Sequence, residues 1–175
     1  MRATMKRYRI ARPGALTAAL LACLLVLPAQ ANEDKHKQIF GYIEDVRVME
    51  LGREMRAKLD TGATTSSIDA REIEKFEKDD EDWVRFTVVN RDTEEHQIVE
   101  EPITRIVHIK RHGKDSQERY VIDLDFCIGD RLITEEVSLT SRKKWNYPLL
   151  VGRNHLAGHV LVDSAIKETR QPSCD

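Results

Sequence analysis

Short runs of β-branched and aromatic residues, separated by polar or glycine-containing turns, dominate this sequence after its first 38 residues. Such runs are typical of β-strands, and segments with the 3.6-residue period of an amphipathic helix are scarce. The expected strands lie in residues 39–48, 49–59 after a turn at Leu51-Gly52, 83–90, 103–109, 119–128, 132–139, 148–151 and 160–163. Many short strands at turn-spaced intervals predict an all-β barrel or sandwich.

Two charged segments between these runs have a different character. Residues 67–77 are expected to form a strand end and a short helical turn, and residues 94–102 a charged connection. The acidic residues 78–82 predict a solvated turn.

One carboxylate follows an apolar strand on a tight loop, at Asp60-Thr61-Gly62. Gly62 permits close backbone approach, and the Thr61 hydroxyl can bond nearby backbone, so the Asp60 side chain would be held by its neighbours. Two such carboxylates within about 3 Å cannot both ionise, and the pair can keep one proton while activating a water. The chain has one Asp-Thr-Gly, so the second carboxylate would come from another copy. The alternative is an Asx or ST turn that closes a hairpin.

The first 31 residues have the composition of a secretory signal peptide. Five basic and no acidic residues lie in 1–12, an apolar run covers 15–27, and Ala29-Gln30-Ala31 has the small-residue pattern of a cleavage site. We therefore predict cleavage near Ala31 and export to the periplasm or the medium. Two alternatives are an uncleaved anchor and lipidation at Cys23, because residues 20–23 resemble a bacterial lipobox.

Cleavage would leave 144 residues, enough for one domain with a sizeable core. The expected organisation is a flexible linker at 32–38, a single domain at 39–165 and a polar tail at 166–175. The signal contains five of the 28 basic and none of the 30 acidic residues, so the formal charge changes from −2 to −7 on cleavage. This charge argues against nucleic acid or an anionic membrane as the main partner.

Cysteine and histidine spacing gives no sign of a metal site. Cys127 lies in an apolar run and Cys174 near the end, so a disulfide and two free thiols are both compatible with the sequence. The chain lacks His-Glu-x-x-His and a phosphate-binding P-loop. The two His-x-x-x-His spacings, 108 with 112 and 155 with 159, are better explained by surface or loop-packing histidines. We expect neither a metal nor another cofactor.

Two motifs in order make the chain resemble a known family. Asp60-Thr61-Gly62-Ala63 after a strand, then a hairpin, then an apolar run ending in Gly152-Arg153-Asn154 is similar to the retropepsin arrangement. The chain more specifically resembles the bacterial retropepsin-like aspartic peptidases related to RimB, long labelled putative ATP-dependent zinc proteases. The matching segments are residues 57–67, 83–88, 118–121, 138–142 and 148–156.

The resemblance implies a fold and a role for the first motif. The fold would be a closed β-barrel with a flap hairpin and a short C-terminal helix. Asp60 matches the catalytic aspartate, and Thr61 the threonine whose hydroxyl bonds across to the other subunit's loop. Gly62 matches the glycine whose backbone faces substrate, and Ala63 completes the loop.

The resemblance also implies a brace and a flap. Gly152, Arg153 and Asn154 match the segment that supports the catalytic loop and the dimer. Retropepsins have an aspartate at the position of Thr64, where it pairs with the arginine, so Arg153 needs a different partner here. By order along the chain, Arg111, His112 and Gly113 match the flap tip, which lacks the run of glycines found in viral flaps.

The leading hypothesis is an exported aspartic endopeptidase that acts as a homodimer on a peptide or protein substrate. Water activated between two Asp60 carboxylates would attack the peptide bond. The alternative is a non-catalytic module of the same fold that binds a peptide or protein in the periplasm. A third hypothesis, cleavage of glutamate-rich or isopeptide-linked tails, depends only on the association of RimB-type proteins with ribosomal-protein glutamylation. An exported chain would not meet ribosomes.

Overall fold

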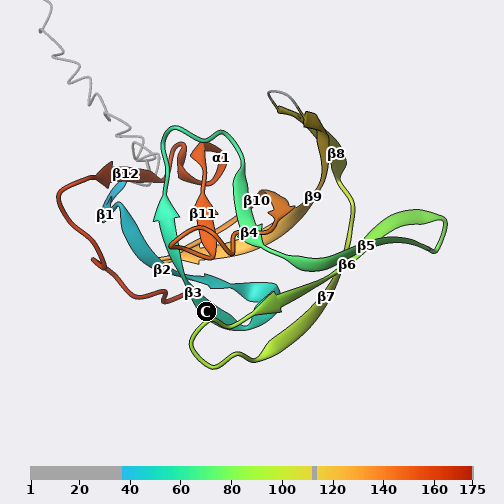
Figure 1. Cartoon of the computed structure of the whole chain (residues 1–175). Helices are drawn as coiled ribbons and strands as arrows, with labels where there is room; N and C mark the ends of the chain where they lie inside the picture. The colour runs from blue at the N-terminus through green and yellow to red at the C-terminus, as the bar shows by residue number, and fades with distance from the viewer. Residues whose placement is uncertain (1–36, 112–113, 175) are drawn as a thin grey trace, which may run out of the picture. The chain divides into compact units, whose positions relative to one another are not determined.

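The computed structural model describes residues 37–111 and 114–174 (Figure 1). The predicted signal peptide, its Cys23 and the flap candidates His112 and Gly113 lie outside the described residues. The strands are β1 Gln38–Gly41, β2 Ile43–Val48, β3 Arg53–Leu59, β4 Ser66–Asp69, β5 Arg71–Lys78, β6 Glu81–Val89, β7 His96–Pro102, β8 Arg105–Arg111, β9 Lys114–Ile128, β10 Arg131–Thr140, β11 Leu149–Val151 and β12 Val160–Asp163. The helices are the 3-10 turn η1 Met49–Leu51 and the single α-helical turn α1 Arg153–Leu156.

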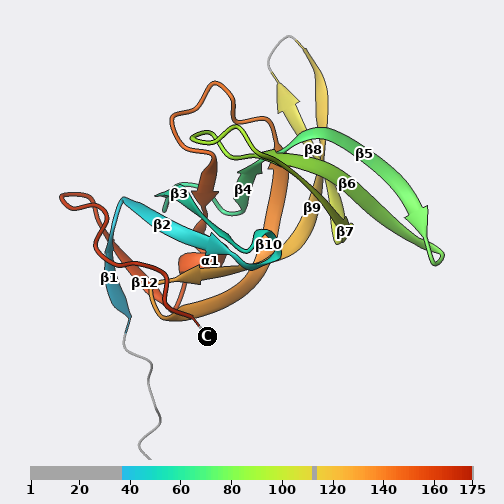
Figure 2. The same ribbon diagram turned by 90° about the horizontal axis from the view of Figure 1, so that it is seen from below.

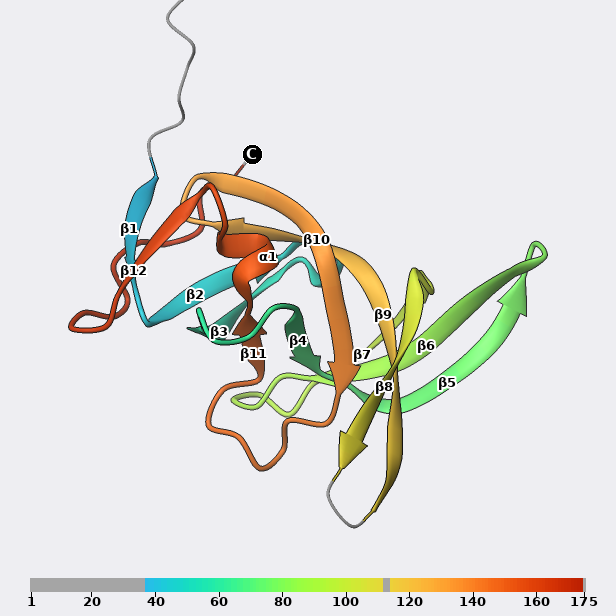
Figure 3. The same ribbon diagram turned by 90° about the horizontal axis from the view of Figure 1, so that it is seen from above.

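Six strands form a closed barrel, which confirms the predicted all-β fold class. The main sheet has the order β10-β4-β11-β3-β2-β9-β8, and β9 also pairs with β10. That second pairing closes a ring and leaves β8 outside it, hydrogen-bonded to the long β9. The β8–β9 hairpin extends beyond the barrel strands (Figures 1 and 3) and occupies the place expected for the flap.

Alternation of side chains explains why the barrel closes around an apolar interior. In β3, Met55, Ala57 and Leu59 are buried and the charged residues between them face outward. The turn before β3 depends on Gly52, whose φ of +61° is a left-handed conformation that favours glycine. The largest fully buried apolar side chains are Phe40, Phe86, Phe126, Ile68, Ile122, Leu124, Ile128, Leu139 and Leu149. Among the described residues, no helix is long and apolar enough to cross a membrane.

Two of the sequence predictions are wrong in a separate three-stranded sheet. Residues 71–78 form strand β5 instead of a helical turn, and residues 96–102 form strand β7 instead of a connection. Both pair with the apolar β6 in a three-stranded sheet (Figure 2). Glutamate and lysine in these segments suit helices and loops better than strands, but pairing with β6 overrides that preference. The predicted acidic turn is present at Asp79 and Asp80, both with positive φ.

The two ends of the described domain lie together. Strand β1 pairs in parallel with β12, and Figure 3 shows them side by side. Residues 164–174 then continue along the barrel, where the buried carboxylate of Glu44 accepts hydrogen bonds from the backbone N–H of Gly41 (2.6 Å) and from the backbone and hydroxyl of Thr169 (2.9 and 2.7 Å). A disulfide joins Cys127 in β9 to Cys174. Of the two possibilities that the sequence left open for these cysteines, the structure has the cross-link.

Candidate active site

Asp60 lies immediately after β3, on a loop held at both ends by backbone hydrogen bonds. Its N–H donates to the carbonyl of Val151 (2.8 Å), and its own carbonyl accepts from the N–H of Ala63 (3.2 Å). Its Oδ1 accepts from the N–H of Gly62 (3.0 Å), and about a quarter of its side chain is exposed. The loop therefore presents a fixed carboxylate that solvent or a ligand can reach.

The charge state of Asp60 reflects opposing influences. Partial burial acts to raise the pKa of Asp60. Three neighbours act to lower it: the Gly62 N–H, the Lys58 ammonium 3.4 Å from Oδ2 and the Ala63 N–H. Together they outweigh burial, and the pKa of Asp60 is lowered overall. In a single chain this carboxylate is therefore ionised at neutral pH.

The segment Gly152 to Asn154, which matches the supporting segment of the family, contacts this loop closely. Strand β11 lies between β3 and β4, the strands on either side of the loop. Gly152 then contacts the loop backbone so closely that a Cβ there would lie 2.7 Å from the carbonyl carbon of Thr65. The N–H groups of Arg153 and Asn154 donate to the carbonyls of Ala63 (2.9 Å) and Thr64 (3.1 Å).

Arg153 finds its partners within the Asp60 loop itself. Its Nη1 donates to the carbonyls of Thr61 (2.9 Å) and Gly62 (3.0 Å), and its Nη2 donates to the Thr64 hydroxyl (2.8 Å). Thr64 therefore serves as a neutral partner where viral retropepsins have an aspartate. The guanidinium holds the two carbonyls next to Asp60 without placing a second carboxylate beside it.

Sequence reasoning missed a buried residue pair behind the loop. The Ser66 hydroxyl accepts from the N–H of Gly152 (2.9 Å) and lies 2.8 Å from His155 Nδ1. His155 is fully buried and stacks on Phe126 with ring centroids 4.2 Å apart. Burial lowers the pKa of His155 to about 4, with the Leu124 backbone acting in the opposite direction, so the imidazole is neutral at pH 7. The only signal in the sequence was that both residues lie within the matching segments 57–67 and 148–156.

A cavity of about 420 Å³ opens beside Asp60. Its basic lining residues are Lys58, Arg105, Arg119 and Arg142, and of the described side chains that line it Asp60 alone is acidic. Apolar groups complete the wall, including Val107 and Ile109 of β8 and Trp145, which is 63% exposed. Sequence analysis assigned no role to Arg105, Val107, Ile109 or Trp145, because only barrel closure brings their elements to the Asp60 loop.

Only part of the predicted flap tip lies among the described residues. Arg111 ends β8 and pairs with Lys114 of β9, so it lies at the tip of the hairpin. His112 and Gly113 fall outside the described residues. The described part of the hairpin that contacts the cavity is its base, through Val107, Ile109, Arg119 and Val121.

No group of three or more histidine, cysteine, aspartate or glutamate side chains suited to a metal ion occurs within residues 37–111 and 114–174. Of the histidines considered above as possible ligands, His155 is instead held by Ser66 and Phe126. The site presents the Asp60 carboxylate beside the basic groups that line the cavity.

Comparisons with known proteins agree on the fold. A model of the RimB-like family, described as the retropepsin-like aspartic endopeptidase RimB, matches residues 39–173. A crystal structure from Legionella pneumophila, of a protein with unknown function, is similar with a TM-score of 0.66 and 33% identity. The match covers 75% of this chain and 96% of that one.

Curated relatives have a different name and are longer. A protein of Desulfotalea psychrophila is 30% identical over 139 residues, and one of Parasynechococcus marenigrum is 31% identical over 111 residues. Each is named a probable alpha-L-glutamate ligase. The matches cover 78% and 62% of this chain but only 30% and 24% of those proteins. The chain thus spans a quarter to a third of the length of these relatives.

Proposed function

The chain belongs to the RimB-like family of retropepsin-like aspartic endopeptidases, and from this premise we propose that it hydrolyses peptide bonds as a homodimer. The observation that carries the proposal is the accessible Asp60 carboxylate, held on a loop whose backbone is fixed by Val151, Arg153 and Asn154. A binding module would need no such acid at the apex of the loop.

Catalysis by this carboxylate requires a second one. The pKa of Asp60 is lowered in the single chain, so one copy has no proton to donate near neutral pH. When a partner's identical loop brings the two carboxylates within about 3 Å, they cannot both ionise, and the pair retains one proton. The exposed loop residues Thr61, Gly62, Thr64 and Arg153 are available for that contact. The dimer is thus part of the proposed mechanism.

The proposed reaction uses the two states of the carboxylate pair. The ionised carboxylate takes a proton from a water molecule, whose oxygen attacks the peptide carbonyl carbon. The protonated carboxyl donates its proton to the carbonyl oxygen as the tetrahedral intermediate forms. Collapse of the intermediate breaks the C–N bond, and the leaving nitrogen takes a proton from the carboxylate that accepted one from water. One hydroxyl of the intermediate returns its proton to the other carboxylate, so an acid and an amine leave and the pair again holds one proton.

The lining of the cavity suggests the class of substrate. An extended peptide would lie along the β8–β9 hairpin and hydrogen-bond like an added strand. Lys58, Arg105, Arg119 and Arg142 surround the site, so acidic side chains next to the cleaved bond would be favoured electrostatically. The name of the curated relatives, alpha-L-glutamate ligase, points to glutamate chemistry as well.

We also propose that the protein works outside the cytoplasm, after removal of a signal peptide near Ala31. The amino-terminal residue pattern supports this location. The Cys127–Cys174 disulfide supports it too, because disulfides persist mainly in oxidising compartments.

The test is cleavage of a peptide library across a pH series by the wild type and by Asp60→Asn, with oligomeric state measured for both by light scattering. Asp130→Asn is a matched control, since that aspartate lies in the exposed turn between β9 and β10. Cleavage that is lost only in Asp60→Asn, while the dimer persists, would support the peptidase. Peptide binding without cleavage in the wild type would favour the binding module instead.

A further inference from the structure

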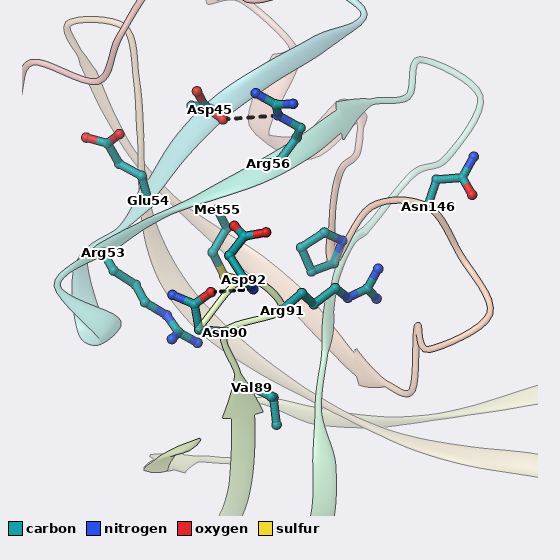
Figure 4. A pocket seen from close by; sticks show the side chains of 11 residues that line it. Asp45, Arg53, Glu54, Met55, Arg56, Val89, Asn90, Arg91, Asp92 and Asn146 are labelled. Atoms are coloured by element: carbon teal, nitrogen blue, oxygen red, sulfur yellow. Dashed lines mark hydrogen bonds and ion pairs between the residues drawn. The ribbon is translucent and has the colours of Figure 1, made fainter. Parts of the chain in front are cut away.

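Arg91 connects the three-stranded sheet of β5, β6 and β7 to the wall of the Asp60 cavity. It follows β6, in the loop that leads to β7, and its side chain lies among the residues drawn in Figure 4. Its Nη1 donates to the carbonyl of Trp145 (2.7 Å), and its Nη2 donates to the carbonyl of Arg142 (2.8 Å). One guanidinium thus binds two carbonyls of the 142–147 turn between β10 and β11, in which the Trp145 N–H also donates to the Arg142 carbonyl (2.8 Å).

A buried carboxylate fixes Arg91 in this position. Asp69, at the end of β4, is only 2% exposed, and its Oδ2 accepts from Arg91 Nη2 (3.0 Å). Its Oδ1 accepts from the backbone N–H of Arg142 (2.6 Å), and its own N–H donates to the Pro148 carbonyl (2.8 Å). Strand β4 begins where the Asp60 loop ends, so Asp69 connects the 142–147 turn to the strand that follows this loop.

The side chains of this turn line the cavity. Arg142 is buried, with Nη1 donating to the Ser67 hydroxyl (2.9 Å) and Nε to the Tyr147 carbonyl (3.0 Å). Trp145 exposes most of its indole, with the Arg142 guanidinium 5.6 Å from the ring centre. An exposed indole on an ordered turn beside Asp60 offers a contact surface for a ligand.

We propose that Arg91 is a positioning residue of the peptidase, which holds the 142–147 turn as a wall of the substrate site without touching substrate itself. The inference rests on the proposed function, because it names how that site keeps its shape. It also gives the three-stranded sheet a role, since the Arg91 loop joins two of its strands. Arginine suits this position because its planar fork reaches two carbonyls and a carboxylate at once, and lysine offers one compact charge.

The kinetic consequence of losing Arg91 follows from its distance from the chemistry. A displaced wall weakens contacts that the substrate makes in both the ground state and the transition state. KM should therefore rise while kcat stays nearly constant. Misplacement by about 1 Å can cost about 100-fold in kcat/KM, so with kcat nearly constant we expect a rise in KM of about tenfold or more in Arg91→Met. Arg91→Lys should recover part of that loss.

The experiment compares Arg91→Met and Arg91→Lys with Arg85→Met. Arg85 is a matched control, because it is an arginine of β6 in an ion pair with Glu100 (2.7 Å) on the exposed face of the same sheet. Trp83 and Trp145 are the two tryptophans of the chain. A Trp83→Phe background therefore makes fluorescence anisotropy and acrylamide quenching report on Trp145. The expected results for Arg91→Met are a raised KM, an unchanged kcat and a more mobile Trp145, with Arg85→Met at wild-type values.

Peptide binding separates failure of this inference from failure of the proposed function. The affinity of a glutamate-rich peptide is measured through Trp145 fluorescence in Asp60→Asn, with and without Arg91→Met. If the wild type cuts no peptide, the proposed function fails, and weaker binding caused by Arg91→Met still supports the positioning role. Equal binding with and without Arg91, no binding to either protein, an unchanged KM, or a loss confined to kcat would each overturn it.

Discussion

Replacing Ser66 by alanine tests whether the Asp60 loop depends on the buried hydroxyl behind it. The Ser66 hydroxyl is the acceptor for the Gly152 N–H and the neighbour of His155 Nδ1, and both Ser66 and His155 are fully buried. Removing it leaves two polar groups without a partner where water is excluded. Each such group costs about 1–3 kcal/mol, so we expect the free energy of unfolding to fall by about 3 kcal/mol. For a domain of this size, that corresponds to a melting temperature lower by roughly 10 °C.

Urea unfolding followed by tryptophan fluorescence at pH 7 measures this change. Ser141→Ala is the matched control, because Ser141 is exposed at the end of β10 and should change stability by less than about 0.5 kcal/mol. We also expect peptidase activity to fall in Ser66→Ala under conditions where the protein remains folded, because Gly152 positions the loop that holds Asp60. A loss of stability below about 1 kcal/mol in Ser66→Ala would refute the reasoning.

Three further predictions concern charge and cross-linking. The pKa of His155 is about 4 in the fold against an ordinary 6.5, so its stabilising contribution is complete above pH 6.5 and is lost as pH falls through about 4. Urea titrations of the wild type should show this fall, and a His155→Gln variant should lack that component of the pH dependence. Lys58→Met removes the ammonium beside Asp60 and should raise the pKa of Asp60. The alkaline limb of the pH–rate profile should therefore move to higher pH. An unmoved limb would mean that Lys58 does not act on the pair of Asp60 carboxylates. Cys174→Ser should lower the free energy of unfolding by about 2–4 kcal/mol, because the disulfide closes a loop of 47 residues, and wild type under strong reductant should match the variant in the same assay.

The sequence predicted those parts of the fold in which apolar alternation and turn residues agree. Strand β3, in which apolar and charged residues alternate up to Asp60, and the apolar β11, which ends at Gly152, are of this kind. Strands β5 and β7 were missed because they lie at the edges of a separate sheet and keep much of their charge exposed. Their conformation is set by pairing with β6, which is not a local property of either segment.

In the candidate site, too, residues within contiguous motifs were predictable and residues brought together only by the fold were not. The resemblance predicted the proximity of Asp60, Thr64 and Arg153, because they belong to contiguous motifs. It did not predict that Arg153 donates to backbone carbonyls. Arg91 and Trp145 are 54 residues apart and meet only through the closed barrel. Neither lies in a motif, so the sequence alone gave no reason to connect them to Asp60.

The pairing of β1 with β12, and of β3 with β11, has a consequence for how the protein is made. Each pair joins segments from opposite ends of the domain, so neither can form until the later strand has been synthesised. Such non-local pairing makes folding slow compared with the folding of helical domains. Asp60 is synthesised long before Arg153 and Asn154, the residues that fix its loop. A nascent chain therefore contains the acid without the structure that orients it, and the proposed peptidase activity cannot begin before β11 and α1 have been synthesised.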